Sequence, residues 1–170
     1  SGLNLYDRTR DDFTRFLSVP GDPKTLSHPG ITSIAEDTAG TLWIGTSGGG
    51  LNAFDRKTRV FKAFRRDAAN PKSISSDEVL DIHPDEAGYL WLATGNGLNR
   101  FDPRAGEFVS FQNDPQVAKS LSHNRVTRVF EDKDGILWIG TDGGLNRFDR
   151  TTGIFLRFLN QPNDSRSLSN

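Results

Sequence analysis

The sequence predicts an all-β protein built from repeated four-stranded units, and three observations predict this class. The segment Leu-Trp-Ile-Gly-Thr at 42–46 returns as Leu-Trp-Leu-Ala-Thr at 90–94 and unchanged at 137–141, so the tryptophans lie 48 and 47 residues apart. Short runs that alternate apolar and polar residues lie between turns rich in Gly and Asp. No segment keeps apolar residues at helical spacing over ten or more residues.

The third copy shows the strands of one unit most clearly. Its first strand is rich in β-branched and aromatic residues, and a four-residue connection that ends at Gly135 leads to the strand with Trp138. Two further alternating strands follow, each after a turn that contains glycine. The four strands are expected at 126–131, 136–141, 145–149 and 154–159.

Four short antiparallel strands in about 47 residues have the size of one β-propeller blade. We therefore expect a β-propeller fragment with three full four-stranded antiparallel blades and an N-terminal half blade, because residues 3–17 match only the two outer strands of a blade. The strands of the full blades should span 31–64, 79–111 and 126–158. The whole chain, 1–170, would divide into a half blade at 1–25, blades at 26–73, 74–120 and 121–167, and the start of a further repeat at 168–170.

Composition excludes several classes of function. The net charge of −1 gives no broad field that would favour nucleic acid or an anionic membrane surface. No apolar run approaches the length that spans a bilayer. The chain has no cysteine, which suits an oxidising compartment and excludes thiolate chemistry. Because it starts inside a repeat and ends just before another first strand, we expect a piece of a longer protein.

The recurring pattern resembles the two-component regulator propeller repeat. It combines Leu-Ser-His-Asn, Val-x-x-Val-x-Glu-Asp, Asp-Gly-x-Leu-Trp-Ile-Gly-Thr and Gly-Gly-Leu-Asn-Arg-Phe-Asp, and 121–149 is its best match in this chain. The resemblance implies the periplasmic sensor region of a membrane histidine kinase, often a hybrid kinase, whose ligand is commonly an oligosaccharide. No kinase or Ig-like domain is visible in this sequence.

Most recurring residues are expected to build the repeat. The tryptophans occupy one position per blade, which favours packing between blades over a sugar-stacking platform. The glycine-rich turns precede strands, whereas a phosphate cradle requires a following helix. Asp132-Lys133-Asp134-Gly135 lacks the later ligands of a calcium loop. The three histidines have no metal-ligand spacing, and no Ser-His-Asp set stands out, so we expect no catalytic residue, metal or cofactor.

Residues that break the repeat are the better candidates for binding, because the scaffold does not require them. Before and inside the first strand of the three copies, one position holds Gly, Glu78 and Arg125, and another holds Ser, Asp81 and Arg128. That strand lines the central channel of a propeller, and loops on a rigid ring carry binding residues. The alternative interpretation is that these residues are ordinary charged side chains at the rim, exposed to solvent. The predicted ligand-binding set is Glu78, Asp81, Arg125, Arg128, His123, Asn96 and Asp142.

We therefore expect a non-catalytic, periplasmic ligand-sensing segment of a two-component sensor, which binds an oligosaccharide or similar polar ligand and passes the signal to a downstream domain. Two alternatives are a propeller lyase of the streptogramin-lyase type and a protein-interaction scaffold. Bare end blades should be covered by another propeller segment or by a second copy of the chain. No nucleic acid and no membrane insertion by this segment are expected.

Overall fold

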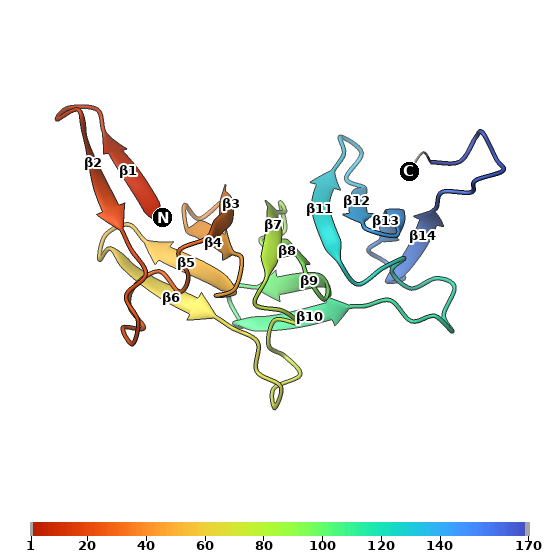
Figure 1. The fold of residues 1–170 in the computed structure, drawn as a ribbon, viewed down its shortest axis with the longest axis horizontal. Helices are drawn as coiled ribbons and strands as arrows, with labels where there is room; N and C mark the ends of the chain where they lie inside the picture. The colour runs from red at the N-terminus through yellow and green to blue at the C-terminus, as the bar shows by residue number, and fades with distance from the viewer. Residues whose placement is uncertain (1, 169–170) are drawn as a thin grey trace.

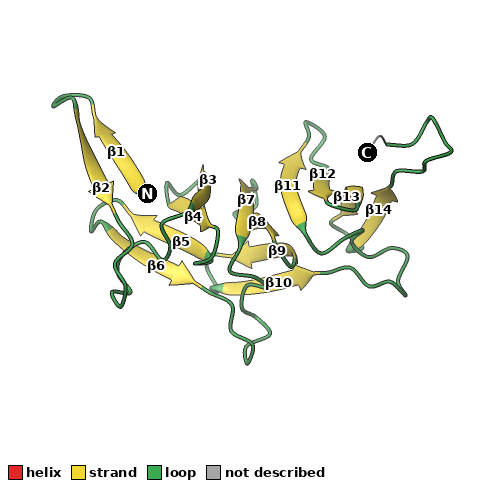
Figure 2. Cartoon of the chain, viewed as in Figure 1, coloured by secondary structure: helices red, strands yellow, loops and turns green. Residues whose placement is uncertain are grey.

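The computed structural model describes residues 2–168 and confirms the predicted fold class. Its fourteen strands form one two-stranded and three four-stranded sheets, and each neighbouring pair is antiparallel. The sheets follow one another in an open arc from the N-terminal end to the C-terminal end, and no helix occurs between residues 2 and 168 (Figures 1 and 2). Hence none of the described residues belongs to a helix long and apolar enough to cross a membrane.

Each full sheet is a four-stranded meander. The half blade contains β1 (Leu3–Asp7) and β2 (Asp12–Phe16). The first full blade contains β3 (Ile31–Glu36), β4 (Leu42–Thr46), β5 (Leu51–Asp55) and β6 (Val60–Phe64). The second contains β7 (Val79–Pro84), β8 (Leu90–Thr94), β9 (Gly97–Asp102) and β10 (Glu107–Phe111). The third contains β11 (Val126–Glu131), β12 (Leu137–Thr141), β13 (Gly144–Asp149) and β14 (Ile154–Phe158).

Strand ends differ from the expected ranges by one residue. The strand with Trp138 begins at 137 because Ile136 belongs to the hairpin, where its amide donates to the Asp132 carboxylate and its carbonyl accepts from the Asp132 amide. The next strand begins one residue earlier than expected, and the last ends one residue earlier. Apart from Leu168, the expected start of a further repeat at 168–170 lies outside the described residues.

Tryptophan packing joins each blade to the next. Trp43 is 4% exposed and meets Phe101 of the second blade edge-to-face, and Trp91 is 2% exposed and meets Phe148 of the third blade in the same way. These two positions confirm the interpretation of the tryptophans as core residues. Trp138 is only half-buried and packs beside Phe158 of its own blade, because no following blade covers it in this structure.

The hairpin before each tryptophan is a structural turn, as the sequence indicates. In the third blade, Asp132 accepts hydrogen bonds from the amides of Asp134 and Ile136 and from the Trp138 indole, the last at 2.8 Å. Gly135 adopts a φ of 75°, which a residue with a side chain rarely adopts. The equivalent indole bonds from Trp43 and Trp91 measure 2.7 and 2.9 Å.

Buried asparagines attach the loop that precedes each blade to the middle of the sheet. Asn99 on β9 is fully buried; it accepts from the Ser75 amide at 3.0 Å and donates to the Ser75 hydroxyl at 2.7 Å. Asn52 and Asn146 make the same pair of bonds in their blades. The recurring Leu-Ser and Leu-Asn pairs of the sequence are therefore the two ends of one clamp, which fixes the loop that carries the candidate site.

Candidate functional site

Two loops of each blade meet at one edge, as expected for a propeller rim. The loop before the innermost strand contacts the loop between the second and third strands through the backbone. In the second blade the Gly95 amide donates to the Glu78 carbonyl at 3.0 Å, and in the third the Asp142 amide donates to the Arg125 carbonyl at 3.2 Å. The Gly50 amide also donates to the carbonyl of Asp77 in the second blade at 2.8 Å. The rim is thus hydrogen-bonded both within blades and between them.

Three of the predicted residues form a line of alternating charge on this rim. The Arg125 guanidinium lies 3.3 Å from the Glu78 carboxylate of the preceding blade and 4.0 Å from the Asp142 carboxylate of its own blade. All three side chains are between 38% and 49% exposed. The line therefore keeps free hydrogen-bonding positions that face solvent, although part of its charge is already compensated internally.

Asp81 has a structural partner on each side. One carboxylate oxygen accepts the amide of Val129 in the third blade at 3.1 Å, and the other accepts the hydroxyl of Ser33 in the first blade at 3.4 Å. The innermost strand of a propeller blade has one unpaired edge, and this carboxylate satisfies part of that edge. Asp81 thus links three consecutive blades around the channel, which gives it a stabilising role that the sequence did not indicate.

The remaining predicted residues lie nearby but do not join the charged line. His123 is exposed, and its Nδ1 accepts the Arg125 amide at 3.0 Å, so the ring holds the loop that carries Arg125. Arg128 is exposed and donates to the adjacent Thr127 carbonyl. Asn96 is half-buried; its side chain donates to the Ser75 carbonyl at 3.4 Å.

The opposite loop edge carries a second polar cluster, which the sequence reasoning missed. Glu131 accepts from Arg150 at 2.9 Å and lies 3.0 Å from His83 of the preceding blade. Residues one repeat apart face each other in neighbouring blades, so the period of 47 or 48 residues was the signal for this contact and for the pair between Glu78 and Arg125. Across residues 2–168, no three His, Cys, Asp or Glu side chains are grouped so that they could hold a metal ion.

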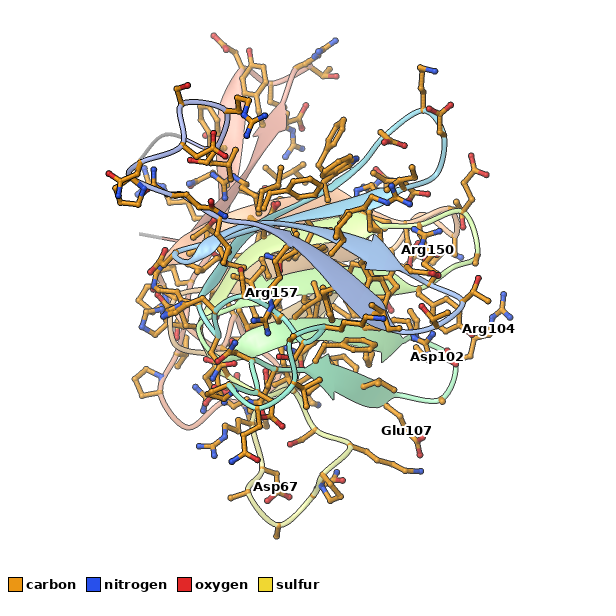
Figure 3. All side chains as sticks on the ribbon, turned by 90° about the vertical axis from the view of Figure 1, so that its right-hand side faces the viewer. Asp67, Asp102, Arg104, Glu107, Arg150 and Arg157 are labelled. Carbon is orange, nitrogen blue, oxygen red and sulfur yellow. The ribbon has the colours of Figure 1, made fainter. Side chains whose placement is uncertain are left out.

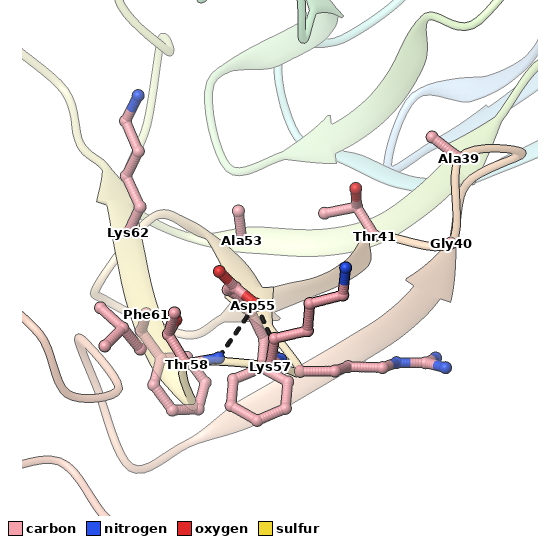
Figure 4. A pocket seen from close by; sticks show the side chains of 12 residues that line it. Ala39, Gly40, Thr41, Ala53, Asp55, Lys57, Thr58, Phe61 and Lys62 are labelled. Atoms are coloured by element: carbon pink, nitrogen blue, oxygen red, sulfur yellow. Dashed lines mark hydrogen bonds between the residues drawn. The ribbon is translucent and has the colours of Figure 1, made fainter.

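A hollow of about 710 Å³ lies away from the predicted rim, at the hairpins of the first blade (Figure 4). Asp55 closes the turn there by accepting the amides of Lys57 and Thr58 at 2.8 and 3.2 Å, which lowers the pKa of its carboxyl group below the usual value of 3.8. This carboxylate is therefore engaged by its own turn and is not free to bind a ligand. The rest of the lining comes from β5, β6 and two hairpins.

Comparison with known proteins identifies the repeats. Residues 25–48, 73–96 and 120–143 match the family model described as the two component regulator propeller. Each full blade of the chain therefore contains one segment that is similar to this repeat. Each matched segment begins just before the Leu-Ser or Ile-Ser pair and ends in the turn after the tryptophan strand, so it covers the loop and the two inner strands of one blade.

Solved structures extend this likeness beyond the three matched segments. The extracellular domain of a protein described as a hybrid two component system of Bacteroides thetaiotaomicron superposes with a TM-score of 0.72 at 29% identity. The superposition covers 79% of this chain and 19% of that one. This chain therefore spans about a fifth of the length of that domain, and it shares the propeller fold of the part that it matches.

Two less similar structures share the fold alone. Virginiamycin B lyase from Staphylococcus aureus superposes with a TM-score of 0.63 at 16% identity, over 94% of this chain and 49% of the lyase. PorZ, a surface component of the type-IX secretion system of Porphyromonas gingivalis, gives 0.60 at 22% identity, over 89% of this chain and 21% of PorZ. No curated protein matches the chain.

Proposed function

We propose that this chain is a non-catalytic, ligand-sensing segment of a periplasmic two-component sensor. The likeness to the extracellular domain of a hybrid two component system, at 29% identity over 79% of the chain, carries the proposal. The three regulator propeller repeats support it. The likeness to the lyase lies at 16% identity and adds no support for catalysis.

The ligand in this proposal is an oligosaccharide or a similar polar molecule bound at the rim. Glu78, Arg125 and Asp142 present alternating carboxylate and guanidinium groups on a backbone that is hydrogen-bonded between blades. Carboxylates accept from sugar hydroxyls, whereas a guanidinium donates to hydroxyls or pairs with an acidic sugar. Arg128, His123 and Asn96 add polar groups near this line, and Asp81 contributes chiefly by joining the blades.

Signal transfer in this proposal is a shift between arrangements of the blades. Glu78 and Arg125 belong to different blades, so a ligand that replaces their mutual contact changes the contact between those blades. A downstream domain attached to the propeller would register that change. No nucleic acid and no membrane insertion by this segment form part of the proposal.

The two end faces are proposed to be covered by another propeller segment or by a second copy of the chain. At the C-terminal end, Phe130 and Leu156 are 62% and 53% exposed and lie in the same cross-strand row as Trp138, Phe130 directly beside it and Leu156 beyond Arg147. At the N-terminal end, Tyr6 and Phe13 form an exposed aromatic pair whose ring centroids are 5.0 Å apart. Exposed apolar faces of this kind are typical of association surfaces.

Isothermal titration against a panel of neutral and acidic oligosaccharides, with and without magnesium, tests the sensing function. We expect binding heat without turnover, and replacement of both Arg125 and Arg128 by alanine should weaken binding at least tenfold, which corresponds to about 1.4 kcal/mol. Lys133→Ala is the matched control, since Lys133 is 89% exposed in a hairpin at the other loop edge. Unchanged affinity in the correctly folded double variant would contradict the rim assignment, and turnover of the ligand would contradict the non-catalytic role.

A further inference from the structure

The loop that precedes each blade folds over the outermost strand of that blade. In the first blade the Phe61 amide donates to the Lys24 carbonyl, and in the third the Phe155 amide donates to the Lys119 carbonyl, both at 2.9 Å. The loop carbonyls therefore lie above the outermost strand, and the residue of that strand that points toward them determines what fills the space beneath the loop.

In the third blade, an arginine of the chain itself fills this space. Arg157 on β14 donates to the carbonyls of Ser120, Leu121 and Val117 at 2.6, 3.1 and 3.1 Å, and to the Ser120 hydroxyl at 2.6 Å. Asn113 adds a further donor to the Leu121 carbonyl at 2.6 Å. Figure 3 labels Arg157 on the blade that faces the viewer. The loop thus forms a cradle of oxygen acceptors whose occupant is a guanidinium group.

The first blade has the same loop but has no side chain equivalent to that of Arg157 or Asn113. Ala63 pairs with Asn52 as Arg157 pairs with Asn146, so Ala63 stands at the arginine position. Ser18 replaces Asn113 at the start of the loop. The result is a hollow of about 750 Å³, lined by residues of the loop and of β6 that include Ser18, Thr25, Leu26 and Ala63.

The second blade is an intermediate case. Ser110 stands at the arginine position, and its hydroxyl donates to the Asn99 side chain at 2.8 Å. Its hollow measures about 230 Å³. The acceptors differ between the first and third blades: among the described residues, the carbonyls of Thr25 and Leu26 receive no hydrogen bond, whereas those of Ser120 and Leu121 receive Arg157.

We propose that the hollow beneath residues 18–27 binds the guanidinium group of an arginine side chain on a partner polypeptide. The third blade shows what the cradle accepts, since a planar guanidinium satisfies several divergent carbonyls at once. The cations on the hollow's wall are engaged: the Lys62 ammonium lies 4.9 Å from the Phe64 ring centroid, and Arg65 donates to the Gly48 carbonyl at 3.4 Å. The Asp22 carboxylate closes the loop turn by accepting the Lys24 amide.

Titration of the 15N-labelled chain with a short peptide that contains one arginine tests the site. The amide signals of residues 24–27 and 62–64 should shift together, and the same peptide with citrulline, which is uncharged and similar in shape, should bind at least tenfold more weakly. N-acetyl-arginine amide is the second arm: affinity equal to that of the peptide assigns recognition to the side chain alone, and tighter binding by the peptide adds contacts from a polypeptide. Equal binding of arginine and citrulline peptides would overturn the proposal.

Variants at Ala63 and Arg157 complete the test. Ala63→Arg should supply the missing internal guanidinium, raise the melting temperature and abolish arginine binding, and Ala63→Met should block binding by volume alone. Conversely, Arg157→Ala should lower the melting temperature, and millimolar ethylguanidinium should restore part of that loss, whereas ethylammonium should not. Arginine binding that survives both Ala63 variants, or equal rescue by the two cations, would contradict the assignment.

Discussion

The Arg125 guanidinium of the third blade lies 3.3 Å from the Glu78 carboxylate of the second, although 47 positions separate the two residues. They occupy one repeat position in consecutive blades, so the repeat period brings them together. This pairing places an acidic and a basic group on either side of a blade boundary, at the rim proposed to bind ligand.

A double-mutant cycle with Glu78→Gln and Arg125→Gln should give a coupling free energy below about 1 kcal/mol, because both side chains are more than a third exposed and solvent screens them. Urea denaturation of the four proteins measures it, and the coupling should shrink further in high salt. A coupling above about 2 kcal/mol would show instead that the pair is a main source of blade cohesion.

Trp91→Ala should reduce the free energy of unfolding by about 3–5 kcal/mol, because the indole is 2% exposed and its removal leaves a cavity between two blades. Trp138→Ala is the matched control: it deletes the equivalent tryptophan in the equivalent strand of the third blade, but on the half-buried end face. It should cost no more than about half as much in the monomeric chain. Equal losses in chemical denaturation would contradict the packing role described for Trp91.

Asn99→Ala should cost at least about 2 kcal/mol, because it removes a fully buried side chain and leaves the half-buried Ser75 amide and hydroxyl without their partner. In the Asn99→Ala variant, hydrogen exchange of the Ser75 amide should also be faster than in the wild-type chain. Asn96→Ala, three residues away in a half-buried loop, should change stability by about 0.5 kcal/mol or less. A neutral Asn99→Ala would show that the clamp does not hold the rim loop.

Stability should fall in acid partly through Asp132. The hydrogen bond from the Trp138 indole, followed by the amide of Ile136, lowers the pKa of this carboxyl group below the usual 3.8. Because the folded state favours the ionised form, the contribution is complete above pH 3.8 and is lost as pH falls through the lower folded-state pKa. Thermal melts of the wild-type chain and of Asp132→Asn between about pH 5 and pH 2 should show a weaker pH dependence for the variant.

The chain should associate through its end faces at micromolar concentration. Sedimentation velocity should show species larger than the monomer, and Leu156→Lys, on the face with Trp138, should shift the distribution toward the monomer. Val117→Lys is the control, since Val117 is 48% exposed but lies in a loop. A stable monomer at tens of micromolar would contradict the covered-end proposal.

The sequence was sufficient for the fold because each blade is specified locally. Trp43, Trp91 and the glycine turns recur at a fixed step, so one set of strand and turn signals was read three times. The site was less predictable. Glu78 and Arg125 stand out in the sequence because they break the repeat, yet their pairing depends on how one blade stacks on the next. The role of Asp81 was missed for the same reason, since its partners Ser33 and Val129 belong to two other blades.

The hollow of the first blade could not be predicted from the sequence either, because it results from two substitutions by small residues within the repeat. Ala63 and Ser18 are small residues that carry no chemical signal of their own. Only the comparison with Arg157 and Asn113, at the same places in the third blade, shows that the space beneath the loop is arranged for a donor group.

The contacts between blades have a direction. Trp43 and Trp91 reach only toward the C-terminal neighbour, where Phe101 and Phe148 receive them in nearly the same edge-to-face geometry, with ring centroids 5.4 and 5.3 Å apart. Each blade boundary is therefore formed by a tryptophan from the N-terminal blade and a phenylalanine from the C-terminal blade. If the second blade were excised, Trp43 would meet Phe148 as it now meets Phe101. In this aromatic contact the blades are equivalent, so a chain that gained or lost one blade would keep the same kind of tryptophan–phenylalanine contact at each boundary, whereas the polar contacts of Asp81 with Ser33 and Val129 would change.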